Sequence, residues 1–225
     1  MKTPNPKYLL LLAILTAVGF SAPAQDNQAG QRFEEKYQAW KTWTTNHWFM
    51  STYDANREYQ EIVALGLPAL PYLFKKIENN PEDFHLEYAV ELISKRKFDK
   101  SEWPPDKLDR LGDSITKSKM YVQWWKVGRH KTGERFGELH ENIKALKAQK
   151  KDIEAAAIRV KILNLGIAVL PAMMVRVEKG DADVIPLISE LTDGAVKADL
   201  KPAECLDWWA KNKQIWLLPT NNENP

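Results

Sequence analysis

Few residues in this chain have the types and spacing that catalysis needs. The four histidines are His47, His85, His130 and His140. None lies in the spacing that holds zinc on a helix, and the sequence has no glycine-rich phosphate loop or nucleophile elbow. The single cysteine, Cys205, would need a neighbouring base to act as a nucleophile, and beside Trp208 it is better explained as a small buried residue. We therefore predict no catalytic, metal or cofactor site, and the sequence favours a protein that is not an enzyme.

One group of side chains has metal-ligand spacing. His130, Glu134 and Glu138 are four residues apart, so a continuous helix would place all three on one side. Three glycines at positions 128, 133 and 137 weaken such a helix, and basic residues lie between the acids. A solvated, mixed-charge surface is the favoured interpretation of this segment.

A basic run, KALKAQKK at residues 144–151, could bind a polyanion such as a lipid headgroup. The acids Glu141, Asp152 and Glu154 flank it and dilute its charge. We interpret the run as the exposed face of a helix.

The nine tryptophans allow a different chemistry, because exposed indole rings can stack on sugars. Trp40, Trp124 and Trp208 are 84 residues apart, and Trp125 and Trp209 double the last two. Equal spacing favours three copies of one structural helix over a glycan platform. Because the first copy has lysine after its tryptophan, we expect Trp124 and Trp208 to point inward and the second member of each pair to be more tolerant of change.

These residues belong to a chain that repeats internally. A shift of 100 residues superposes residues 62–78 on residues 162–178. The identical pairs are Ile62 and Ile162, Leu65 and Leu165, Gly66 and Gly166, Leu70 and Leu170, Pro71 and Pro171, and Glu78 and Glu178. Apolar residues fill most of the other positions at helical spacing, and Leu65 and Leu165 are expected to be the last apolar residues of the first helix in each copy. Each copy therefore predicts two helices that bury a common seam.

The motif has a physical reason at each position. Gly66 and Gly166 follow the first helix, and glycine alone adopts a left-handed conformation there at no steric cost. Pro71 and Pro171 fall in the first turn of the next helix, where the N–H that proline lacks has no intrahelical partner. Each copy is therefore expected to form a helical hairpin.

The pattern resembles the HEAT family of helical repeats, in which a Leu-Gly turn and a proline-bearing second helix recur. The resemblance implies an all-α fold of stacked antiparallel hairpins and brings no catalytic residue with it. The double-tryptophan segment near the C-terminus resembles a helix found in exported bacterial proteins of this kind. The helices expected from periodicity and start signals span about 31–50, 53–66, 68–78, 81–96, 105–117, 119–128, 134–165 with a break, 168–178, 183–193 and 202–214.

The N-terminus predicts export. Lys2 and Lys7 precede the uncharged segment Tyr8–Phe20, and Ala22 and Ala24 provide the small residues of a signal-peptidase site. We expect cleavage after residue 24, a disordered linker at 25–30, one helical domain at 31–218 and a disordered tail at 219–225. With no lipid-attachment cysteine near the site, the mature protein is expected to be periplasmic or secreted.

Removing residues 1–24 leaves 30 basic and 30 acidic residues, since only two of the 32 basic residues and no acid lie in that segment. Net charge therefore favours neither nucleic acid nor a membrane as a partner. One cysteine cannot form an intramolecular disulfide, so packing must hold the fold.

The function that these features favour is a non-enzymatic interaction module that binds a peptide or protein partner on its helical surface. Two alternatives stay open. One is a peptidoglycan-binding module that uses exposed tryptophans, and the other is a hydrolase whose site is built from scattered acids.

Overall fold

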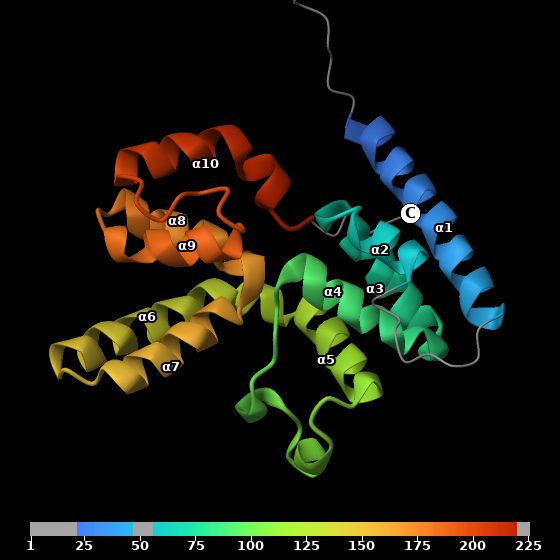
Figure 1. Cartoon of the computed structure of the whole chain (residues 1–225), viewed down its shortest axis with the longest axis horizontal. Helices are drawn as coiled ribbons and strands as arrows, with labels where there is room; N and C mark the ends of the chain where they lie inside the picture. The colour runs from blue at the N-terminus through green and yellow to red at the C-terminus, as the bar shows by residue number, and fades with distance from the viewer. Residues whose placement is uncertain (1–21, 47–55, 220–225) are drawn as a thin grey trace, which may run out of the picture.

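Every regular element in residues 22–46 and 56–219, which this computed structural model describes, is a helix (Figure 1). The α-helices are α1 (Ala22–Asn46), α2 (Arg57–Val63), α3 (Leu70–Asn79), α4 (Leu86–Ser94), α5 (Ser114–Lys126), α6 (Thr132–Ala148), α7 (Asp152–Leu163), α8 (Leu170–Glu178), α9 (Ile185–Leu191) and α10 (Pro202–Trp216). Short 3-10 helices join them: η2 (Leu67–Ala69), η3 (Pro81–His85), η4 (Lys100–Glu102), η5 (Pro105–Arg110), η6 (Gly128–Lys131), η7 (Gly166–Val169) and η8 (Ala182–Val184). The predicted all-α class is confirmed.

The order of elements in the first half recurs in the second. A helix packs on α2 or α7, a 3-10 turn leads into α3 or α8, and a second 3-10 turn leads into α4 or α9. A tryptophan-bearing helix then closes each half, α5 against α3 and α10 against α8. We call residues 22–126 unit 1 and residues 132–216 unit 2.

Each unit has its own hydrophobic core. The core of unit 1 includes Phe33, Trp40, Leu73, Tyr121 and Trp124, and these side chains come from α1, α3 and α5. The core of unit 2 is built in the same way, with members such as Phe136, Met173, Ile188 and Cys205. Two partly buried leucines, Leu67 and Leu218, pack against both cores, so the units share a boundary.

The two Leu-Gly turns have the positive φ that the sequence predicts, but Gly66 has a ψ of −153° and so lies outside the left-handed helical region expected for a cap. Gly66 and Gly166 both have positive φ, 67° and 69°. Pro71 and Pro171 lie in the first turns of α3 and α8. One difference is that a 3-10 turn, η2 or η7, precedes each second helix, so α3 and α8 begin at Leu70 and Leu170 and not at residue 68 or 168.

The leucines of these turns require a correction. Leu65 and Leu165 were expected at the ends of the first helices, but they lie beyond them, because α2 ends at Val63 and α7 ends at Leu163. Each leucine amide donates to the carbonyl three residues earlier, at 3.2 Å and 3.1 Å, so the chain has already tightened from α-helical to 3-10 geometry. The two positions also differ in burial. Leu165 is 7% exposed and belongs to the core of unit 2, whereas Leu65 is only partly buried against the core of unit 1.

Other helix boundaries differ from the sequence expectation. Residues 105–117 and 119–128 do not form two helices, because residues 105–110 form a 3-10 turn and α5 runs without interruption from Ser114 to Lys126. The Asp113 side chain accepts the Thr116 amide and so starts α5 there. The expected break within 134–165 lies at Lys150, which has a φ of 58°.

The N-terminal expectations need one correction. Residues 25–30, predicted as a disordered linker, are part of α1. The physical reason is that the segment contains no proline, and Pro23 lies in the first turn, where proline is compatible with a helix. The predicted signal peptide, up to residue 21, lies outside the described residues, as do residues 220–225 of the predicted tail.

The expected third copy of the tryptophan helix is also wrong. Trp124 and Trp208 occupy the closing helices of the two units, whereas Trp40 lies in α1, whose counterpart in order and packing is α6. The spacing of 84 between Trp40 and Trp124 therefore does not mark equivalent positions.

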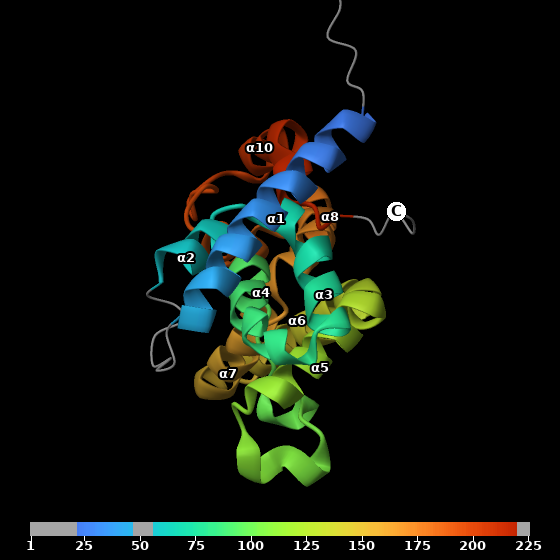
Figure 2. The same ribbon diagram turned by 90° about the vertical axis from the view of Figure 1, so that its right-hand side faces the viewer.

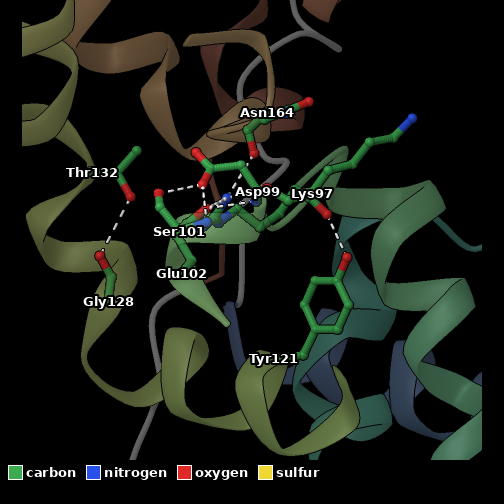
Figure 3. Close-up of polar contacts among 9 residues, drawn as sticks. Lys97, Asp99, Ser101, Glu102, Tyr121, Gly128, Thr132 and Asn164 are labelled. Atoms are coloured by element: carbon green, nitrogen blue, oxygen red, sulfur yellow. Dashed lines mark hydrogen bonds and ion pairs between the residues drawn. The ribbon is translucent and has the colours of Figure 1, made fainter. Parts of the chain in front are cut away.

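A polar junction joins the two units where the Gly166 turn meets the end of α4. The Lys97 amide donates to the Asn164 carbonyl (2.9 Å), and the buried Arg96 guanidinium donates to the same oxygen (2.9 Å). Arg96 also pairs with Glu102, and the Tyr121 hydroxyl donates to the Arg96 carbonyl. Figure 3 shows Asn164 of unit 2 beside Asp99 and Glu102 of unit 1.

No single helix in the described part of the chain is long and apolar enough to cross a membrane, although the bent pair Asp152–Leu163 and Gly166–Glu178 passes the length and composition criteria together.

Candidate functional site

In each unit, an aspartate between the third and fourth helices contacts two side chains of the first helix, at equivalent positions in the two units. In unit 1, Tyr37 and Lys41 of α1 hold Asp83, and in unit 2, His140 and Lys144 of α6 hold Asp181. The partners are four residues apart in both helices, so they project from one face. The recurrence indicates that the aspartate has an architectural role in both units.

The cluster in unit 1 is closed. Asp83 has no exposed surface, and Lys41 Nζ lies 2.7 Å from its Oδ1. The Tyr37 hydroxyl donates to the other carboxylate oxygen. Burial and the neighbouring carboxylate raise the pKa of Tyr37 well above its ordinary value, so Tyr37 stays protonated as a donor.

The cluster in unit 2 lies nearer the surface. His140 Nε2 is 2.8 Å and Lys144 Nζ 2.6 Å from Oδ2 of Asp181. Partial burial acts to raise the pKa of Asp181, but the hydrogen bonds from Lys144 and His140 outweigh it and hold the pKa below its ordinary value. Because Asp181 is ionised near neutral pH and can only accept, His140 Nε2 is the protonated donor in this hydrogen bond.

This His-Asp pair does not have the access that a general base requires. The His140 residue is 3% exposed, and its ring stacks on Phe136 with centroids 5.3 Å apart. A catalytic base must come within hydrogen-bond reach of the proton that it removes. We therefore assign His140 to anchoring η8 against α6.

An open depression of about 540 Å³ adjoins the anchored aspartate. Its lining consists of Lys144, Arg176, Lys179, Gly180, Asp181, Ala182 and Asp183. Three cationic side chains and two carboxylates therefore line the depression, and Asp181 is held by Lys144 and His140. The Lys144 side chain is 44% exposed, so its ammonium is available to solvent and to a ligand. We call this depression the α8–η8 pocket.

Carboxylates also converge inside unit 1, between α4 and α5. Lys117 lies 3.2 Å from Glu87 Oε2 and pairs with Glu91 as well. The Glu87 oxygen is within ion-pair distance but not in hydrogen-bonding geometry, and it has no hydrogen-bond partner. Burial raises the pKa of Glu87, although Lys117 opposes the shift. This arrangement is an ion-paired cluster between α4 and α5.

The remaining sequence candidates are dispersed. His130 lies in η6, whereas Glu134 and Glu138 lie in α6, and all three are exposed; Glu138 pairs with Arg135 at 2.8 Å. The basic run is divided, because Lys144 and Lys147 face the acids Asp181 and Asp183. No group of three potential metal ligands occurs in residues 22–46 and 56–219. Cys205 is fully buried.

The described tryptophans differ in burial, with Trp43 of α1 partly buried. Trp40, Trp103, Trp124 and Trp125 are buried, so both members of the first pair belong to the interior. Trp208, Trp209 and Trp216 are half-buried on α10, with the Trp208 ring 6.4 Å from Trp209 and 6.0 Å from Trp216. Trp124 points inward as predicted, but Trp125, expected to be the more tolerant member of the pair, is equally buried, and Trp208, expected to point inward, is only partly buried.

Sequence reasoning missed Asp181, Arg176 and Lys179 as pocket residues. A signal was present, because a shift of 103 residues superposes Tyr37 on His140 and Lys41 on Lys144. The aspartates differ by 98 residues, so a single offset of 100 does not align them. Only the tertiary contacts show that the two clusters correspond.

Neither a known protein family, nor a curated protein, nor a solved structure shows significant similarity to the chain.

Proposed function

We propose that this protein is an exported HEAT-like interaction module that binds an acidic peptide segment of a protein partner in the α8–η8 pocket. The observation that carries the proposal is the difference between the two aspartate clusters. Asp83 is sealed inside unit 1, whereas Asp181 borders an open depression with Lys144, Arg176 and Lys179 around it.

The lining of the pocket carries one more positive than negative formal charge, because Lys144, Arg176 and Lys179 outnumber Asp181 and Asp183. Arg176 pairs with Glu141 at 2.9 Å on one side, and Lys144 pairs with Asp181, so both cations are held in place. Lys179 is exposed at the end of α8 and adds a third positive charge. Prepositioned cations bind carboxylates by charge-assisted hydrogen bonds at little cost in side-chain entropy. His140 holds Asp181 from the interior, and the ligand would contact the three cationic side chains that line the pocket.

The direct test is a fluorescence anisotropy titration with a labelled glutamate-rich peptide. We expect binding that weakens with added salt and is lost in Lys179→Glu. The matched control is Lys75→Glu, the same charge change on an exposed residue of α3 in unit 1. Equal binding of a glutamine-rich peptide, or equal loss in both variants, would contradict the proposal.

A second candidate function is glycan binding on α10, favoured by the three clustered, partly buried indole rings of Trp208, Trp209 and Trp216. Indole faces stack on apolar faces of other rings. Its test is quenching of tryptophan fluorescence by peptidoglycan fragments, compared between the natural protein and Trp209→Ala. Quenching that Trp209→Ala abolishes would favour this function over peptide binding.

Export is part of the proposal, and it predicts a mature N-terminus at Gln25. The intact mass of protein recovered from the periplasm or medium of an expressing bacterium tests it. A protein that retains Met1 would contradict export.

A further inference from the structure

One outer helix has an apolar stripe that no other described element covers. On α7, Ile153 is 86% exposed and Val160 is 54% exposed. Ala156 and Ala157 lie between them and are also exposed. The spacing of three, four and seven residues places all four side chains on one face. Figure 1 shows α7 beside α6 in a hairpin that extends from the rest of the chain.

At two of these four positions the matching helix of unit 1 has exposed polar residues. A shift of 100 residues superposes Ala157 on Arg57 and Val160 on Gln60, and both residues of α2 are exposed. The fold therefore accepts polar residues on the outer face of this helix. The apolar stripe of α7 is not required by the architecture that the two units share.

Opposite charges border the stripe on both sides. At 100° per residue, Asp152 and Arg159 lie along one flank, and Glu154 and Lys161 lie along the other. On each flank the acid precedes the base by seven residues, two helical turns. Arg159 also pairs with Glu190 of its own chain at 2.7 Å.

We propose that α7 pairs with α7 of a second copy of this chain in an antiparallel, two-fold symmetric dimer. The two-fold axis would pass between Ala156 and Ala157. Ile153 of one copy then lies level with Val160 of the other, and the alanines between them allow the two backbones to approach closely.

This register also brings opposite charges together. On one flank Glu154 of each copy lies within about 3 Å, along the helix axis, of Lys161 in the other copy, because the two positions differ by two residues of 1.5 Å rise. On the other flank Asp152 and Arg159 meet in the same way. A parallel pair would instead place acids beside acids and bases beside bases, which is unfavourable. Charge complementarity therefore selects a second copy in the antiparallel orientation.

The experiment is sedimentation velocity over a range of concentrations with the chain that begins at Gln25. The stripe is short, so we expect a weak dimer that forms reversibly as the concentration rises. Ile153→Ser should weaken dimerisation by more than about tenfold, because each dimer loses two apolar contacts. Ile215→Ser, on an exposed residue of α10, is the matched control and should dimerise normally.

Charge exchange tests the orientation. Glu154→Lys and Lys161→Glu should each weaken dimerisation, and the double variant should restore it because the ion pairs re-form with reversed sign. A protein that stays monomeric at all concentrations, a dimer unaffected by Ile153→Ser, or a double variant as weak as the single variants would overturn the proposal. So would dimerisation that requires residues 1–24, since the stripe would then receive that segment.

Discussion

At the scale of single residues, the two turn glycines occupy identical motif positions but should differ in how much a substitution destabilises the protein. An added Cβ at Gly66 meets nothing within 4 Å, whereas at Gly166 it would lie 2.6 Å from the Arg96 amide nitrogen and closer still to the Ser94 carbonyl oxygen. The first glycine is needed for its backbone conformation alone. The second is needed for conformation and for the close approach of unit 1.

We predict that Gly66→Ala destabilises the protein by about 1–3 kcal/mol, because Gly66 has φ 67° and ψ −153°, a backbone conformation almost restricted to glycine. Gly166→Ala should cost more, because the Cβ also displaces backbone atoms of residues 94–96. Denaturant unfolding of the two variants measures the difference. Equal losses would show that the junction can move aside freely.

The buried carboxylate of Glu87 predicts an unusual pH dependence. Its pKa is raised by burial, so the folded protein binds this proton more tightly than the unfolded chain does. Protonated Glu87 therefore stabilises the fold at pH values below its pKa in the unfolded chain. This stabilisation is lost as the pH rises through the pKa of Glu87 in the folded protein. We expect Glu87→Gln to raise the free energy of unfolding at pH 7 and to have less effect below about pH 4.

Urea unfolding as a function of pH tests this prediction. Glu91→Gln is the control, because Glu91 pairs with the same Lys117 and accepts the Tyr121 hydroxyl at 3.3 Å. A Glu87→Gln protein that is less stable than the natural one at pH 7 would show that the ion pair with Lys117 outweighs the cost of burial.

At the scale of elements, the closing helices α5 and α10 occupy the same place in the two units but differ in burial. Trp125 of α5 is 4% exposed, stacks on Phe74 at 4.6 Å and lies under the Arg129 guanidinium at 3.9 Å. Its counterpart Trp209 of α10 is half-buried. Figure 2 shows α10 at the edge of the molecule, beyond α8.

We predict that Trp125→Ala costs roughly 3–5 kcal/mol, a typical loss for a buried tryptophan, and that Trp209→Ala costs clearly less. Thermal and denaturant unfolding of the two variants compare them directly. If Trp209→Ala proved equally destabilising, the Trp209 ring would contribute more to packing than its partial burial indicates.

At the scale of the whole molecule, the boundary between the two units includes a small polar junction as well as the apolar contacts of Leu67 and Leu218. Arg96 is 4% exposed and donates to the Asn164 carbonyl of unit 2 while it pairs with Glu102 of unit 1. The carbonyl of Pro219, beyond α10, accepts from Arg129 Nη1 at 2.9 Å and forms a second connection. Cooperative unfolding of both units should therefore depend on these few contacts.

We predict that Arg96→Met destabilises the protein by roughly 1–3 kcal/mol, since it removes the guanidinium that donates to the Lys97 and Asn164 carbonyls and pairs with Glu102. It should also separate the amide exchange rates of α3 and α4 from those of α8 and α9. Arg57→Met, on an 86% exposed side chain that pairs only with Glu61, is the control and should cost under about 1 kcal/mol. Uniform exchange across both units in Arg96→Met would show that apolar contacts alone couple them.

The sequence by itself determined the features that depend on local rules. Apolar spacing of three and four residues predicted helices, and glycine and proline marked the two turns, because backbone sterics act within a few residues. The repeat offset of 100 then predicted two hairpins of the same kind. The helical class and the positive φ of Gly66 and Gly166 followed correctly from these patterns.

Only the tertiary structure decided which of two equivalent positions is buried and which is exposed to solvent. The carboxylates that join Tyr37 with Lys41 and His140 with Lys144 lie about 40 residues farther along the chain, and spacing carries no information on contacts at that separation. The burial of Trp125 and the exposure of Ile153 were equally hidden, because each depends on whether a distant element packs against that face. Periodicity shows that a helix has an apolar face, but the neighbour that covers it, or leaves it for a partner, is set by how the two units pack.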